Sequence, residues 1–119
     1  MELDKRELKR AYRETPRPMG VYQILNTVNG KQYIGSSLDL EGIRNRLWFG
    51  LGMGNDNFRR GLQADWKTHG EEAFRFEVLE YLKPDGDPAR NYREELAIME
   101  ELWLEKLQPY GEKGYNKPR

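Results

Sequence analysis

An Asn29-Gly30 pair stands between two short runs of residues that favour β structure. Asn-Gly is the dipeptide most typical of a tight hairpin turn. Valine, tyrosine, isoleucine and leucine precede it, and a Tyr-Ile pair follows it. We therefore predict an antiparallel hairpin over about residues 20–36, with Tyr22 and Tyr33 close together on its two strands.

Glycines flank this predicted hairpin, because Gly20 opens its first strand and Gly35 closes its second. Glycine has no Cβ, so another backbone can approach it closely. We expect the space beside the two tyrosines to admit the backbone of a ligand.

The rest of the chain predicts helices and one further strand. Apolar residues at helical spacing indicate helices over about 40–50, 58–69 and 90–107. Alternating apolar residues indicate a strand over about 74–79. The predicted fold class is therefore α+β: a small antiparallel three-stranded sheet, made of the hairpin plus a third strand, covered by helices.

Cap residues and glycines mark the predicted ends of the helices. Asp39 ends a Ser-Ser-Leu-Asp run that is typical of a helix N-cap. Gly70 is a suitable C-cap for the helix before it. Gly50, Gly52 and Gly54 are expected to end the first helix and begin a flexible loop.

The chain of 119 residues is long enough for one modest core. Residues 2–13 alternate in charge and predict a short, mostly solvated helix, which the prolines at 16 and 18 would end. We therefore divide the chain into an N-terminal helical extension, 1–18, and a single domain, 19–119.

Composition excludes several kinds of chemistry. The chain has no cysteine, so disulfides, thiolate zinc sites and cysteine nucleophiles are excluded. Its one histidine, His69, is better explained by capping or packing than by a metal site or a catalytic triad. No run approaches the roughly 20 apolar residues of a membrane span, and no signal peptide is recognisable. We expect a soluble, cytoplasmic protein with no membrane partner.

Charge is unevenly distributed along the chain, although the net charge is zero. Residues 1–70 carry 12 Lys/Arg and 8 Asp/Glu, whereas residues 71–119 carry 8 Lys/Arg and 12 Asp/Glu. A folded domain with one basic face would favour contacts with phosphate groups. Divided charge is also common in ordinary soluble domains.

Phosphate chemistry would need a cation and a base near the tyrosines. A phenol with a pKa of about 10 is a poor base unless a cation or a metal-bound water assists it. Arg44 and Arg46 lie on the first predicted helix of the domain, and the planar guanidinium suits a phosphate. Because they are two residues apart, only one is expected to face the hairpin.

The last predicted helix carries several glutamates, most of which are expected to be solvated. Glu100 lies three residues before Trp103 and four after Leu96, at the margin of the apolar stripe. One inward carboxylate, together with phosphate oxygens and waters, suffices for Mg²⁺.

Taken together, these segments resemble the GIY-YIG nuclease family, in the family's order and over about residues 19–116. Gly20-Val21-Tyr22 and Tyr33-Ile34-Gly35 resemble the two tripeptides that give the family its name. Residues 62–79 resemble a middle segment of its homing-endonuclease branch. Glu100 matches the glutamate of its last helix, and Gly114-Tyr115-Asn116 resembles its C-terminal motif.

The resemblance implies hydrolysis of DNA phosphodiester bonds at a single divalent metal, Mg²⁺ or Mn²⁺. It leaves the form of the substrate open, between duplex, branched or damaged DNA and RNA, and we expect duplex or branched DNA as the partner. It implies that Glu100 binds the metal and that Asn116 braces the site. Tyr22 or Tyr33 would be the general base or orient the attacking water.

The resemblance also implies a catalytic arginine. The family commonly places it ten residues after the tyrosine of the second tripeptide, and in this chain that position is Ile43. An insertion of one residue before this position would make Arg44 the equivalent arginine, and an insertion of three would make it Arg46. A branch of the family carries Asn-Arg here, so the Asn45-Arg46 pair favours Arg46.

Two alternatives remain open. Some relatives carry a histidine where this chain has Asn57, which cannot act as an acid or base. This favours a nucleic-acid-binding domain that keeps the nuclease fold without cleaving. An interaction domain would instead leave Tyr22, Tyr33 and Glu100 scattered.

Overall fold

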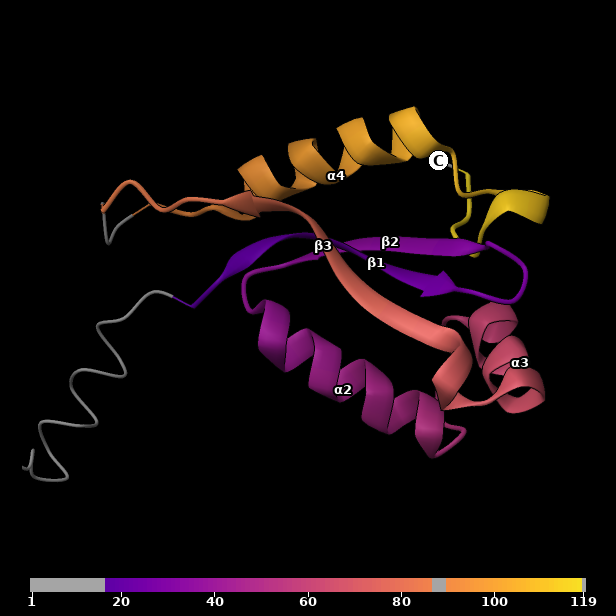
Figure 1. Ribbon diagram of the computed structural model, residues 1–119. Helices are drawn as coiled ribbons and strands as arrows, with labels where there is room; N and C mark the ends of the chain where they lie inside the picture. The colour runs from indigo at the N-terminus through magenta and orange to yellow at the C-terminus, as the bar shows by residue number, and fades with distance from the viewer. Residues whose placement is uncertain (1–16, 87–89, 119) are drawn as a thin grey trace, which may run out of the picture.

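The computed structural model describes residues 17–86 and 90–118 and centres on a three-stranded antiparallel sheet (Figure 1). Strands β1 (Met19–Asn26) and β2 (Gln32–Ser37) form the hairpin, and β3 (Phe74–Leu82) pairs with the other side of β1. The strand order is β2-β1-β3, so β2 is an edge strand. The predicted α+β class and sheet are confirmed.

Helices cover both faces of this sheet. Helices α2 (Leu40–Gly52) and α3 (Arg60–His69) lie on one side, and α4 (Arg93–Leu107) lies on the other (Figure 1). Two short 3₁₀ turns, Glu71–Ala73 and Gly111–Lys113, precede β3 and follow α4. The helix predicted over 2–13 lies outside the described residues. Within those residues, no helix combines the length and apolarity of a bilayer span.

Side chains alternate along β1 and fill a separate core on each face. Tyr22 and Ile24 are buried against α2 and α3, with Leu51, Leu62 and Trp66 among their neighbours. The core on the other face contains buried Val21, Ile34 and Leu104. The sheet is therefore buried between two helical layers.

The predicted helix caps are confirmed, but one predicted helix end is wrong. The Asp39 carboxylate accepts a hydrogen bond from the Gly42 amide, and Gly70 ends α3 with a φ of 83°. Helix α2 does not stop at Gly50 but continues through Gly52. Burial of Leu51 in the last turn of α2 outweighs the cost of about 1 kcal/mol for each helical glycine.

Strand β3 is longer than predicted and contains an irregularity. It extends to Leu82, and its register with β1 shifts so that Val21 pairs with Glu80 while Tyr22 pairs with Val78. Leu79 is the extra residue, and it packs with the core on the α4 side. The shift lies directly beside the first tyrosine of the hairpin.

Candidate active site

The two tyrosines of the hairpin face the α2 side of the sheet. Tyr22 pairs with Gly35 across the strands, and its ring centroid lies 6.5 Å from that of Tyr33. Phe76 stacks on the other side of Tyr22 at 5.0 Å. Strand pairing therefore brings the tyrosines together, and Phe76 fixes the orientation of the first.

The space beside the flanking glycines is occupied by the protein itself, so the expectation of a ligand backbone there is wrong. A Cβ on Gly35 would lie 2.5 Å from the Tyr22 hydroxyl oxygen. A Cβ on Gly20 would overlap the Glu80 carbonyl oxygen of β3. Gly35 is needed to seat the phenol, and Gly20 is needed to pair the strands.

Replacing Gly35 with alanine is therefore expected to displace Tyr22. We expect Gly35→Ala to lower the free energy of unfolding by about 1–3 kcal/mol, the usual cost of overpacking. Gly50→Ala is the matched control, since open space surrounds Gly50 within α2; it should stabilise the protein by about 0.5–1 kcal/mol. Urea denaturation measures both, and equal stability of the two variants would contradict this assignment.

The Tyr22 hydroxyl stays protonated at neutral pH. Only 2% of the residue is exposed, and this burial raises its pKa well above the ordinary value. Neighbouring Tyr33 and Glu100 raise the pKa further, and the positive charge of Arg59 opposes them. Tyr22 can therefore donate a hydrogen bond, whereas partly buried Tyr33 remains the better placed of the two to contact water.

A cation from the loop between α2 and α3 lies over the second tyrosine. The guanidinium carbon of Arg59 is 5.0 Å from the centroid of the Tyr33 ring. Burial alone would lower the pKa of Arg59, but the charge interactions with Tyr33 and Asp56 outweigh it, and the pKa is raised. The guanidinium is thus held in its charged form beside the tyrosines.

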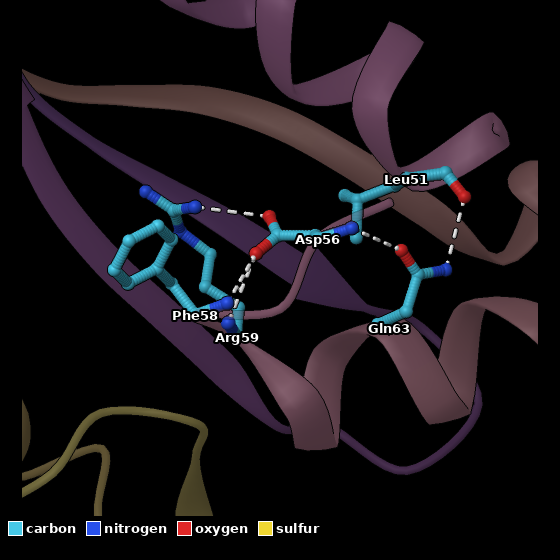
Figure 2. Close-up of polar contacts among 5 residues, drawn as sticks. All are labelled: Leu51, Asp56, Phe58, Arg59 and Gln63. Carbon is cyan, nitrogen blue, oxygen red and sulfur yellow. Dashed lines mark hydrogen bonds and ion pairs between the residues drawn. The ribbon is translucent and has the colours of Figure 1, made fainter. Parts of the chain in front are cut away.

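Asp56 anchors this arginine in a small polar network (Figure 2). Its carboxylate accepts hydrogen bonds from the Phe58 and Arg59 amides and forms an ion pair with Arg59 at 2.9 Å. Its own amide donates to the Gln63 side chain, which in turn donates to the Leu51 carbonyl. The loop is thereby tied to both α2 and α3.

Glu100 reaches the same region from α4, on the other face of the sheet. The Ser36 hydroxyl donates to its carboxylate at 3.2 Å. Glu100 is also close enough for its charge to raise the pKa of Tyr22. Because β2 is an edge strand, groups from both faces converge around Gly35 and Ser36.

The oxygens of Glu100 and Ser36 suit a hard cation. Among the described residues, no three His, Cys, Asp or Glu side chains form a metal-binding group. Mg²⁺ does not require such a cage, because it can bind through one or two carboxylates, with waters and phosphate oxygens completing its shell. The donor set therefore fits the divalent metal that the family resemblance implies.

Asn116 braces β2 between Tyr33 and Gly35. Its side chain accepts a hydrogen bond from the Ile34 amide at 2.9 Å and donates to the Ile34 carbonyl at 2.8 Å. Both outward backbone groups of Ile34 are thereby satisfied. Asn116 acts on the position of the strand rather than on a reacting group.

Arg44 and Arg46 are both exposed on α2. Around the helix, Arg44 lies on the side of Trp48, which packs against Phe76 of β3. Arg46 lies on the opposite side of α2. Because β2 and β3 flank β1, we expect Arg46 rather than Arg44 to reach toward Tyr33.

Sequence reasoning missed Arg59, Asp56 and Ser36 as parts of this site. The Asp-x-x-Arg spacing of residues 56 and 59 is a signal for a local ion pair. It does not indicate which surface the arginine covers, because that depends on how the loop folds back onto the sheet.

The fold and the groups that converge at the edge of β2 are those of a small α+β nuclease domain. The catalytic domain of homing endonuclease I-TevI matches with a TM-score of 0.67 and 30% identity, over 85% of this chain and 99% of that domain. A glutamate-to-alanine variant of that domain matches with a TM-score of 0.66 and 28% identity, over 83% and 92%.

The chain belongs to the GIY-YIG nuclease family. No family model matches its sequence, and no match is found among the curated proteins.

Proposed function

We propose that the protein is an endonuclease that hydrolyses DNA phosphodiester bonds with the help of a divalent metal, Mg²⁺ or Mn²⁺. The observation that carries the proposal is the convergence of Tyr22, Tyr33 and Glu100 around Gly35. Similarity to the catalytic domain of a homing endonuclease supports the same conclusion. The substrate is proposed to be duplex or branched DNA.

Each group has a role that follows from its position. Glu100, with Ser36 beside it, would hold the metal, which when bound would stabilise charge on the phosphate. Tyr33 would orient the attacking water or accept its proton, next to the positive charge of Arg59. Protonated Tyr22 would donate a hydrogen bond to an oxygen of the reacting phosphate.

Two further residues would support the reaction from outside the tyrosine pair. Arg46, the arginine of α2 that we favour over Arg44, would hold a non-bridging phosphate oxygen through its planar donors. Asn116 would keep β2 in register and so keep Tyr33 aligned.

Nicking of supercoiled plasmid DNA tests the proposal directly. We expect open-circular and linear products with Mg²⁺ or Mn²⁺, and no products with EDTA, because the metal is proposed to stabilise the charge on the phosphate. Gel electrophoresis over time measures the rate, and restoring Mg²⁺ to the EDTA-treated protein should restore it.

Two outcomes would contradict the proposal in different ways. Cleavage that persists in EDTA would refute the metal dependence. Tight binding of linear and branched DNA without cleavage in either metal would instead favour the non-cleaving domain, for which Asn57 is the motivating residue.

A further inference from the structure

A basic cavity lies at the start of α3, next to the proposed active site. Its volume is about 440 Å³, and Arg59, Arg60 and Lys117 are among its lining residues. No acidic side chain is among the described residues that line it. A cavity with this lining favours an anion.

The backbone adds to the positive character of this cavity. Arg60 and Gly61 are the first residues of α3, whose first amides have no acceptor within the helix. The N-cap residue Arg59 makes no side-chain cap bond, and the carboxylate of Asp56 binds the Arg59 amide just before these residues. Because Arg60 and Gly61 line the cavity, the positive end of the α3 dipole adds to the charge of the three cationic side chains there.

Aromatic side chains give the cavity a second property. Tyr115 lines one wall, and its hydroxyl is fixed because it donates to Asp65 at 2.6 Å and accepts from Asn26 at 3.1 Å. Phe58 also lines the cavity and is 90% exposed. Exposed aromatic rings among cations are typical of sites where nucleobases stack.

Arg59 links this cavity to the tyrosines. It lines the cavity while its guanidinium covers the Tyr33 ring, and Asp56 holds it there (Figure 2). The Nη1 atom of its guanidinium bonds to Asp56, and its Nε has no hydrogen-bond partner among the described residues. A strand that passes from the tyrosines to α3 would therefore meet continuous positive charge.

We propose that this cavity binds the nucleotide next to the cleaved bond, with its phosphate between Arg60, Lys117 and the start of α3, and its base on Phe58. The inference rests on the proposed function, since it assumes a DNA substrate. In this assignment Phe58, Arg60 and Lys117 bind the DNA strand, and these three residues are separate from those proposed to perform hydrolysis.

The test is DNA binding in EDTA, where no cleavage occurs, measured by fluorescence anisotropy over a range of NaCl concentrations. The double variant Arg60→Ala/Lys117→Ala should raise the Kd about tenfold and reduce the slope of log K against log salt by about 1–2, because two phosphate contacts are lost. The control Arg75→Ala/Lys83→Ala removes the same charge from exposed positions that do not line the cavity.

Phe58→Ala provides an independent arm of the same experiment. Loss of stacking should raise the Kd about tenfold without changing the salt slope. A Phe58→Trp variant should keep the affinity, because its ring can still stack.

The proposal is overturned if the double variant has the Kd and slope of its charge-matched control. If metal-dependent nicking is intact in that case, only the cavity assignment fails. If the protein neither binds nor nicks DNA, both the cavity assignment and the proposed function fail.

Discussion

Glu100→Ala is expected to reduce metal-dependent nicking of plasmid DNA by about 100-fold or more, because it removes the carboxylate proposed to hold the metal. Glu100→Gln should lose nearly as much, since an amide keeps the shape but not the charge. The Ser36 hydroxyl can still donate to the glutamine oxygen, so the fold should be retained in this variant.

Glu105→Ala is the matched control for this change. It removes the same charge from an exposed position further along α4 and should leave the nicking rate unchanged. Rates for the variants are compared by gel electrophoresis at saturating Mg²⁺, with thermal unfolding as a check on folding. Activity that survives in both Glu100 variants would exclude this residue as the metal ligand.

Arg59→Ala is expected to reduce the nicking rate by about 10²-fold, the usual effect of removing one donor from a stabilised transition state. The change removes the cation over Tyr33 and leaves the Asp56 carboxylate without its ion-pair partner. An unpaired carboxylate with only 7% of its side chain exposed would repel the phosphate. Arg59→Lys should recover part of the rate by restoring charge without the planar fork.

The double variant Asp56→Asn/Arg59→Ala separates these two causes. If repulsion by Asp56 dominates, the double variant should be faster than Arg59→Ala alone. If the missing cation dominates, the two should be equally slow. An unchanged rate for Arg59→Ala would show that this arginine has no part in the reaction.

Arg44→Ala and Arg46→Ala complete the comparison. Arg46→Ala is expected to lose about 10²-fold and Arg44→Ala little, given their positions on opposite sides of α2. The reverse result would identify Arg44 as the phosphate ligand of this helix.

The hairpin was predictable because its turn depends on local chemistry. Gly30 has a φ of 77°, which glycine adopts readily, and the Asn29 side chain accepts a hydrogen bond from the Lys31 amide. The Asp39 cap is local in the same sense, since its partner is three residues away. Adjacency of Tyr22 and Tyr33 then follows from strand pairing alone.

The end of α2 was not predictable in this way. Gly50 and Gly52 favour a break by their intrinsic propensity, yet α2 continues because Leu47 and Leu51 are buried against the sheet. That burial depends on how the whole helix is placed on the sheet, and this placement cannot be inferred from the spacing of the glycines.

The residues of the site can likewise be divided into those placed by local sequence and those placed by tertiary contacts. Its tyrosines follow from the hairpin, but Ser36 and Glu100 meet across 64 residues and two faces of the sheet. Arg59 reaches Tyr33 only because the network of Asp56 and Gln63 folds the loop over the domain. Contacts of this kind depend on tertiary structure rather than on residue spacing.

The hydrogen bonds between Asn116 and Ile34 determine when, during synthesis of the chain, the site can be completed. The two residues are separated by 82 positions, and neighbouring Gly114 pairs with Gln32 on the same strand. During synthesis on the ribosome, the outer edge of β2 therefore lacks these partners until residue 116 has left the exit tunnel. The outer edge of the strand that carries Tyr33 gains its partners only at that late stage, so the growing chain gains a complete site after most of residues 19–116 have emerged.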